Sequence, residues 1–220
     1  MKKEIIFTKD GSSSLYIPEL NETYHSRFGA IQEAKHVFIK NGLSLCTDKV
    51  ISVLEIGFGT GLNAFITYLE TLKSNQNINY VALEAYPVEQ ELVSQLNYVS
   101  QLNALDYQTI FNEMHQSSWE VENQISANFN LTKKQQKFED ITDQNTFNLI
   151  YFDAFGFDVQ PELWNEVMFQ NMYQALQFKG VLVTYACRSS IKKAMLSAGF
   201  TVEKLPGAPG KREMLRAIKN

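Results

Sequence analysis

Three glycines at alternate positions, Gly57, Gly59 and Gly61, follow an apolar stretch that begins at Val53. The pattern predicts a strand that runs into a tight turn and opens a helix, where a ligand can approach bare backbone. The spacing G-x-G-x-G differs from the G-x-G-x-x-G of nicotinamide-binding turns. Glu55 would repel a pyrophosphate but suits an ammonium group. S-adenosylmethionine (SAM) carries an ammonium and no phosphate, so we expect a SAM site here, with a ligand-free turn as the alternative.

Two further acidic positions are expected at the carboxyl ends of strands, where open α/β sheets bind ligands. Glu84 lies 23 residues after Gly61, close to the spacing of about 20 at which an acid reaches ribose hydroxyls. Asp140 is the candidate for the adenine amino group, and its neighbours Glu139 and Asp143 are equally suited. Any of these acids alone is also consistent with a solvated loop.

An apolar run ends at Asp153 and leads into an aromatic loop that contains Phe155, Phe157 and Trp164. Aromatic faces can stack on a flipped nucleobase. A carboxylate among them can accept a proton or a hydrogen bond from an amine, and an acid at the end of an apolar strand needs such a partner. The alternative for Phe155 and Trp164 is a core position at the junction of a strand and a helix.

Composition narrows the class of protein. The 220 residues fit one domain, or one domain with an appendage. There is no apolar run long enough for a membrane span and no signal-peptide pattern. Two cysteines make no disulfide framework, and the histidines at 25, 36 and 115 show no metal-ligand spacing. We therefore expect a cytoplasmic protein without a metal.

Charge is distributed unevenly along the chain. The net charge is −4, yet the segment from Arg188 to Asn220 holds eight basic and two acidic residues, while the rest holds 12 basic and 22 acidic residues. Such asymmetry predicts a face that binds a polyanion. A solvated basic tail is the alternative.

These residues must be positioned by alternating strands and helices. Strands are predicted at 50–56, 80–83, 147–152, 180–185, 200–205 and 213–218, and helices at 62–72, from 87 to 99, 161–176 and 189–198. Only a short loop joins the last two strands, so they should pair antiparallel. We expect a class I SAM-dependent methyltransferase fold over residues 48–220, Rossmann-like, with a mostly parallel seven-stranded sheet. Residues 1–47 are predicted to form an appendage, a hairpin at 4–17 and a helix at 27–41.

Four stretches together resemble one family. They are DGSSS at 10–14 with ETYHSRFGAIQE at 22–33, LEIGFGTGLN at 54–63, YFDAFGFDVQPELW at 151–164 and PGAPGKREM at 206–214. With these, the chain resembles the MnmC-type tRNA methyltransferase domain, which finishes 5-methylaminomethyl-2-thiouridine at the wobble position. The family usually has proline where this chain has Phe157, and glycine-aspartate where it has Glu139-Asp140. The FAD-dependent oxidoreductase domain often fused to this family is absent, so a standalone form is expected.

The resemblance implies methyl transfer from SAM to the amine of 5-aminomethyl-(2-thio)uridine in the anticodon of a tRNA, with Asp153 as the catalytic residue that orients the amine and receives its proton. A separate enzyme would supply the aminomethyl-uridine. The cofactor-binding residues are expected to be Glu55, Gly57, Phe58, Gly59, Gly61, Asn63, Glu84 and Asp140. Substrate-binding residues are expected to be Tyr24, His25, Phe155, Trp164, Lys211 and Arg212.

Three other functions remain open. A spermidine-synthase-like aminopropyltransferase shares fold and amine chemistry but should have more acids in its pocket. A NAD-dependent dehydrogenase is disfavoured by Glu55 and by the glycine spacing. A non-catalytic RNA-binding module with a SAM fold would keep the basic segment and dispense with Asp153.

Overall fold

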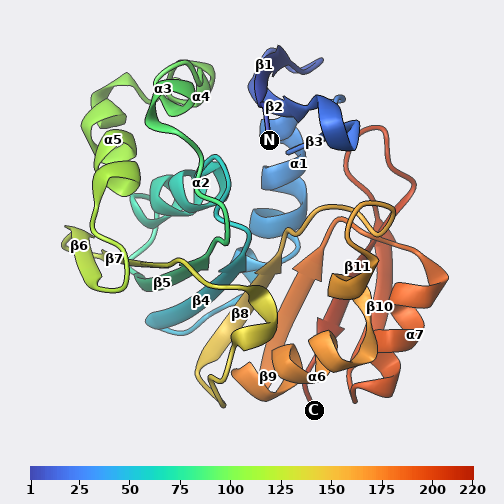
Figure 1. Cartoon of the computed structure of the whole chain (residues 1–220). Coiled ribbons are helices and arrows are strands. Elements are labelled where there is room, and N and C mark those ends of the chain that lie inside the picture. Colours follow the sequence, from blue (N-terminus) through green and yellow to red (C-terminus); the bar gives the residue numbers. More distant parts are fainter.

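A twisted eight-stranded sheet is the centre of the computed structural model, which describes all 220 residues (Figure 1). Its strands in chain order are β4 (Val50–Ile56), β5 (Asn77–Leu83), β6 (Glu122–Ser126), β7 (Phe129–Lys134), β8 (Phe147–Phe152), β9 (Leu176–Thr184), β10 (Thr201–Pro206) and β11 (Glu213–Ile218). The order across the sheet is β10-β11-β9-β8-β4-β5-β7-β6. The five strands β7, β5, β4, β8 and β9 run parallel. Their carboxyl ends therefore meet at one edge of the sheet.

The two ends of the sheet are antiparallel. β11 pairs antiparallel with both β9 and β10, which confirms the predicted terminal hairpin. At the opposite edge β6 pairs antiparallel with β7, so the predicted count of seven strands is wrong by one. β6 carries the polar residues Glu122, Asn123 and Gln124. An edge strand of this composition lacks the apolar alternation that identifies a strand in a sequence.

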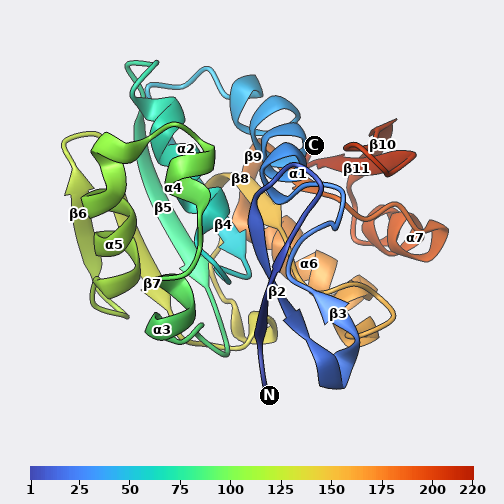
Figure 2. The same ribbon diagram turned by 90° about the horizontal axis from the view of Figure 1, so that it is seen from above.

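Helices cover both faces of the sheet and create two hydrophobic cores (Figure 2). One face is covered by α2 (Leu62–Thr71) and α5 (Gln108–Gln116), and the other by α6 (Glu166–Ala175) and α7 (Ser189–Ser197). Parallel strands buried on both faces are expected to be almost wholly apolar. β8 fits this rule, because five of its six residues are buried.

The helix predicted after Pro87 is broken into α3 (Gln90–Val93) and α4 (Tyr98–Gln101). Asn97, between the two, exchanges hydrogen bonds with the N-terminal segment. Its backbone N–H donates to the Ser13 hydroxyl at 2.9 Å, its side-chain oxygen accepts from the Ser13 N–H at 2.7 Å, and its Nδ2 donates to the Gly11 carbonyl at 2.9 Å. These contacts are stronger than the local preference for one continuous helix.

The N-terminal segment forms the predicted hairpin from β1 (Glu4–Phe7) and β2 (Ser13–Ile17), with β3 (Glu22–Thr23) added. This small sheet lies over the carboxyl ends of the parallel strands (Figure 1). The helix that follows, α1 (Ala30–Ala34) with its π-helical continuation Lys35–Lys40, packs into the main core, where the Phe38 ring lies 5.0 Å from that of Tyr151. A domain boundary at residue 47 stays a prediction. The packing of Phe38 against Tyr151 joins this helix to the central sheet.

None of the helices is long and apolar enough to cross a membrane. The structure contains no cluster of three or more histidine, cysteine or acidic residues that could hold a metal ion.

Candidate active site

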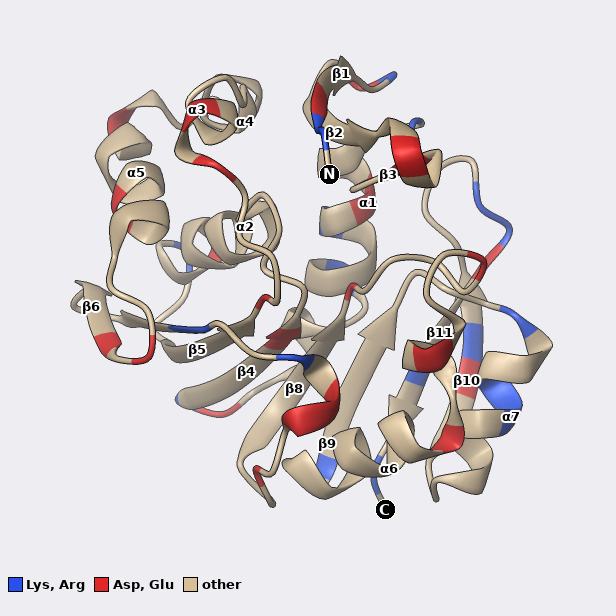
Figure 3. Ribbon diagram, in the orientation of Figure 1, with Lys and Arg blue, Asp and Glu red and all other residues tan.

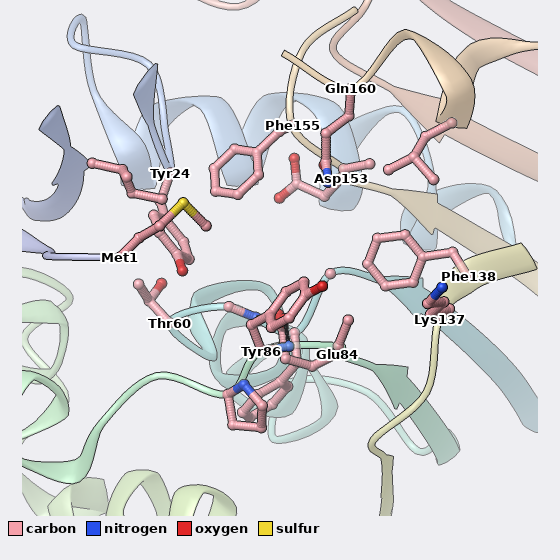
Figure 4. A pocket seen from close by; sticks show the side chains of 18 of the residues that line it. Met1, Tyr24, Thr60, Glu84, Tyr86, Lys137, Phe138, Asp153, Phe155 and Gln160 are labelled. Atoms are coloured by element: carbon pink, nitrogen blue, oxygen red, sulfur yellow. Dashed lines mark hydrogen bonds between the residues drawn. The ribbon is translucent and has the colours of Figure 1, made fainter. Parts of the chain in front are cut away.

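A cavity of about 530 Å³ opens at the carboxyl ends of the parallel strands. Its walls come from the glycine-rich turn after β4, the end of β5, the segment before β8, the aromatic loop after β8, and the N-terminal sheet. Figure 4 shows Asp153 and Phe155 on one side of this cavity and Glu84 and Tyr86 on the other. Segments far apart in the sequence thus enclose one space large enough for a small ligand.

The glycine-rich turn needs its glycines for conformation and for space. Gly57, Gly59 and Gly61 all have positive φ, from +49° to +93°. A Cβ on Gly59 would lie 3.2 Å from the Tyr24 ring, and one on Gly57 would lie 2.9 Å from the Asp153 carbonyl oxygen. The turn therefore brings bare backbone to the cavity wall, as the sequence predicts.

Glu84 is fixed at the end of β5 by two backbone donors. One carboxylate oxygen accepts from the Gly59 N–H at 2.9 Å and the other from the Tyr86 N–H at 2.8 Å. Each oxygen keeps a further lone pair, so the carboxylate can still accept hydrogen bonds from hydroxyl groups in the cavity. This geometry suits the ribose role that the sequence predicts for Glu84.

Asp153 reaches the cavity from the end of β8. Its Oδ2 accepts a hydrogen bond from Asn63 Nδ2 at 2.8 Å. Burial, reinforced by the charge of Glu33, raises the pKa of Asp153 to about 7, while the Asn63 hydrogen bond and the positive charge of Lys211 act in the opposite direction. A carboxyl group that titrates near neutral pH can both accept and release a proton.

Beside Asp153, two aromatic rings form an edge-to-face pair. The Phe155 and Tyr24 rings lie 5.1 Å apart at 84°. Both line the cavity, as does His25, whose Nδ1 lies 3.0 Å from the Ser14 hydroxyl. Burial lowers the pKa of His25 to about 4, so its imidazole is neutral at pH 7. The structure brings all three predicted residues to the wall of the cavity.

Glu55 does not line the cavity. It is fully buried beneath the glycine-rich turn, and its Oε1 accepts from Asn63 Nδ2 at 3.0 Å. Burial raises the pKa of Glu55 well above its usual range, and the negative charge of Asp153 adds to this effect. Asn63 therefore stands between Glu55 and the cavity, which corrects the predicted direct contact between Glu55 and a ligand.

Asn63 offers the cavity an unused acceptor. Its Oδ1 is buried without a hydrogen-bond partner, and so is Oε2 of Glu55. Buried acceptors of this kind are costly unless a partner arrives. An ammonium group supplies such a partner at Asn63. The residues present therefore fit the methionine end of SAM.

Three other predicted residues lie away from the cavity. Trp164 is 1% exposed, packs against Phe152 at 5.0 Å and donates its ring N–H to the Phe155 carbonyl at 2.8 Å. The turn Pro161–Trp164 points this ring into the core, so Trp164 supports the loop from below. Arg212 is exposed to solvent, and Lys211 pairs with Glu33. None of the three is placed to touch a ligand in the cavity.

Asp140, the residue predicted to contact the adenine amino group, does not line the cavity. Asp140 is exposed and outside the lining, whereas its neighbour Glu139 lines the cavity together with Phe138 and Lys137. The short helix Phe138–Asp140 turns these neighbours in different directions. Of the acids that the sequence allowed for the adenine contact, Glu139 is therefore the one that lines the cavity. An aromatic residue directly before the acid was a usable signal for this site.

A buried lysine supports the glycine-rich turn from outside the cavity. Lys133 has no exposed surface, and its amine donates to the His115 carbonyl at 2.6 Å and lies 4.8 Å from the Trp119 ring. His115 in turn places Nε2 3.1 Å from the Thr60 carbonyl. Burial lowers the pKa of His115 to about 4, so the ring is neutral and Nε2 donates. Lys133 lies on β7, inside the sheet between β5 and β6.

Ionisation of Asp153 is expected to make the folded chain less stable. Its pKa is about 7 in the folded chain, against 3.8 for an unperturbed aspartate. Between these values the unfolded chain has lost a proton that the folded chain retains, so stability falls as the pH rises from 3.8 to about 7. Asp153→Asn cannot ionise and should have a higher Tm than the wild type at pH 8, with the difference vanishing near pH 4. Thermal unfolding at both pH values checks this, and a lower Tm for the variant at pH 8 would contradict it.

Comparisons with known proteins show the family and the fold of this chain. A family model described as S-adenosyl-L-methionine-dependent methyltransferase matches residues 94–220. Two relatives are named tRNA 5-methylaminomethyl-2-thiouridine biosynthesis bifunctional protein MnmC. The one from Leptospira borgpetersenii is 27% identical over 210 residues, 89% of this chain and 32% of the relative. The one from Delftia acidovorans is 26% identical over 232 residues, covering 99% and 35%. The chain thus spans about a third of the length of these relatives.

Solved structures share the fold. MNMC2 from Aquifex aeolicus superposes with a TM-score of 0.73 at 23% identity, covering 98% of this chain and 70% of that one. Spermidine synthase from Thermotoga maritima gives a TM-score of 0.53 at 15% identity, covering 95% and 69%.

The parallel sheet, its antiparallel hairpin and the glycine-rich turn at the cavity define a class I methyltransferase fold. The chain belongs to the S-adenosyl-L-methionine-dependent methyltransferase family, and its resemblance to MnmC-type methyltransferase domains is confirmed by the relatives it matches.

Proposed function

We propose that this methyltransferase transfers a methyl group from SAM to the primary amine of 5-aminomethyl-(2-thio)uridine at the wobble position of tRNA. The observation that carries the proposal is that the carboxyl group of Asp153 and the glycine-rich turn line the same cavity. Burial raises the pKa of this carboxyl group to about 7. The two MnmC relatives are named for the biosynthesis of 5-methylaminomethyl-2-thiouridine in tRNA, and this supplies the substrate class of the proposal.

The cavity offers one set of contacts for each part of the cofactor. Glu84 can accept from the ribose hydroxyls, Asn63 Oδ1 from the ammonium group, and Glu139 from the adenine amino group, beside the Phe138 ring. When bound, SAM supplies a methyl group on a positively charged sulfur. The bare backbone at Gly59 lets the cofactor approach without a side chain in the way.

Asp153 prepares the amine for attack. A primary amine in water is mostly protonated, and only its neutral form is a nucleophile. The ionised Asp153 carboxylate can accept the proton and, through a hydrogen bond, hold the nitrogen in position. Asn63 keeps this carboxylate in place by donating to Oδ2. Phe155 and Tyr24 offer ring surfaces beside it on which a flipped uracil can stack.

The transfer of labelled methyl groups tests the proposal against its main alternative. The purified protein is incubated with labelled SAM and tRNA from cells that lack this modification, and in parallel with decarboxylated SAM and a diamine. We expect label in the tRNA and no aminopropylated product. Label absent from tRNA, together with aminopropyl transfer, would replace the proposal by the spermidine-synthase-like function. A bound cofactor without any transfer would favour the RNA-binding module.

The basic C-terminal region is the expected tRNA docking face, but ion pairs neutralise much of it. Lys and Arg gather on α7 and the β10–β11 hairpin (Figure 3). Four of its cations pair with carboxylates, in the pairs Arg188–Asp158, Lys204–Glu213, Lys211–Glu33 and Arg216–Glu203. Lys192, Lys193 and Arg212 form no salt bridge within the chain. These three remain free to contact phosphates.

Neutralising Lys192 and Lys193 together as Lys→Gln is expected to weaken tRNA binding and flatten its dependence on salt. Each lost phosphate contact should reduce the slope of log affinity against log salt by roughly 0.7 to 0.9. The matched control is Lys204→Gln with Arg216→Gln, two cations already paired, which should change the slope less. The affinity for tRNA, measured at several salt concentrations for each double variant and the wild type, tests this expectation. Equal slopes in both double variants and the wild type would exclude α7 from the docking face.

A further inference from the structure

The aromatic loop after β8 holds its own backbone in place through internal hydrogen bonds. The N–H groups of Val159 and Gln160 both donate to the Gly156 carbonyl, at 2.9 Å and 3.0 Å. The Gln160 carbonyl accepts in turn from the Leu163 N–H at 3.1 Å. These bonds fix the backbone at residue 160 relative to Phe155, which directly precedes Gly156.

The side chain of Gln160, in contrast, takes no part in holding the loop. It is half-buried and lines the cavity, and the only hydrogen bonds that Gln160 makes within the chain are those of its backbone. Asn165, the next carboxamide along the chain, uses both of its groups on the protein. Its Nδ2 donates to the Glu162 carbonyl at 2.8 Å, and its Oδ1 accepts from the Met168 N–H at 2.9 Å. The Gln160 carboxamide is therefore free to bind a ligand.

Gln160 belongs to the wall of the cavity that faces the proposed ribose contact. Figure 4 shows it with Asp153 and Phe155 on one side of the cavity, and Glu84 and Tyr86 lie on the other. In the proposed function Asp153 meets the amine of the substrate and Phe155 its ring, whereas Glu84 meets the ribose of SAM. The free carboxamide therefore lies on the side of the cavity that the target base would occupy.

The Watson–Crick edge of uracil matches a carboxamide. It presents the N3–H donor beside the oxygen on C4, and C4 is bonded to C5, the atom that carries the aminomethyl group. With that amine at Asp153, the C4 oxygen and N3–H are the next polar groups around the ring. A carboxamide can donate to the oxygen and accept from N3–H at once, whereas a carboxylate has no donor to offer. Flipped bases are read by hydrogen bonds of this kind to their Watson–Crick edge.

We propose that Gln160 recognises the target base, with Nε2 donating to the oxygen on C4 of uracil and Oε1 accepting from N3–H. The inference rests on the proposed function, because it needs an aminomethyl-uridine in the cavity. It gives each of three loop residues one part of the substrate, since Asp153 takes the amine, Phe155 the ring face and Gln160 the edge. Because the backbone at residue 160 is already fixed, only the Gln160 side chain has to become ordered when the base binds.

A tRNA with a methyl group on N3 of the target base tests this contact. Two tRNAs are prepared by ligation, one with 5-aminomethyl-2-thiouridine at the wobble position and one with its N3-methyl derivative, and kcat/KM is measured on each. We expect the wild type to be roughly tenfold or more less efficient on the N3-methyl tRNA, the discrimination typical of a bidentate base contact. Gln160→Leu should lose about as much on the tRNA with a free N3 and should lose most of the N3-methyl penalty. Its affinity for SAM, measured by calorimetry, should match the wild type.

The matched control is Gln135→Leu, which removes the other glutamine of the cavity wall and should keep the wild-type N3-methyl penalty. Gln160→Ala repeats the test with a side chain too short to replace the carboxamide. No penalty in the wild type, or an equal penalty in the wild type and both Gln160 variants, overturns the inference, because a loss of structure slows both tRNAs alike. Methylation of the tRNA with a free N3 would then leave the proposed function in place. If the wild type methylates neither tRNA, the proposed function fails and the inference fails with it.

Discussion

Asp153→Asn is expected to reduce tRNA methylation roughly 100-fold or more, the loss typical of removing a positioned proton acceptor. An amide has the same shape as a carboxylate, and its oxygen can still accept the hydrogen bond from Asn63. It cannot take a proton from the substrate ammonium. The amine would then have to arrive neutral from solution, where that form is scarce. SAM affinity should stay close to the wild type, because the cofactor contacts proposed at Glu84, Asn63 and Glu139 are retained.

Single-turnover methylation and calorimetric SAM binding on the same preparations separate the two effects. The matched control is Asp158→Asn, in the same aromatic loop, where the carboxylate is exposed and paired with Arg188. This variant should keep the wild-type rate. A wild-type rate in Asp153→Asn would show that Asp153 has a structural role only.

Gly59→Val is expected to abolish measurable SAM binding, and Gly59→Ala to weaken it at least about tenfold. Gly59 has φ of +49°, a conformation that costs side-chain-bearing residues roughly 1–2 kcal/mol, and a β-branched one more. A Cβ there would also lie 3.2 Å from the Tyr24 ring. About 1.4 kcal/mol corresponds to a factor of ten in affinity. The turn would have to relax, and its backbone would move into the space proposed for the cofactor.

Gly156, in the loop that follows Phe155, provides the control. Gly156 has no positive φ, and a Cβ on it would come no closer than 3.7 Å to another atom. Gly156→Ala should therefore bind SAM like the wild type in calorimetry. Wild-type affinity in Gly59→Val would mean that SAM does not bind against this turn.

Local patterns predicted the parts of the site that a short segment determines by itself. The glycines at 57, 59 and 61 were identifiable because the turn needs positive φ. Asp153 was identifiable because an acid at the end of an apolar strand needs a partner, and that partner is Asn63. Glu84 followed from its spacing after the turn.

The errors occurred where long-range packing decides. In a sequence, an aromatic residue near a catalytic loop looks the same whether its ring packs in the core or contacts a ligand. Only the direction of the turn at 161–164 excludes Trp164 from the cavity. The pairing of Lys211 with Glu33 joins residues from opposite ends of the chain, and no local pattern contains it. Asn97 broke a predicted helix through contacts with the N-terminal hairpin.

The most direct test of the proposed function is the identity of the methylated nucleoside. The protein is incubated with SAM and tRNA that carries 5-aminomethyl-2-thiouridine, and the digested nucleosides are analysed by mass spectrometry, with Asp153→Asn as the control. We predict that 5-aminomethyl-2-thiouridine is converted into a product heavier by one methylene unit, with the added methyl group on the side-chain nitrogen. A methyl group on any other nucleoside, or on a ring atom of this one, would contradict the proposed function.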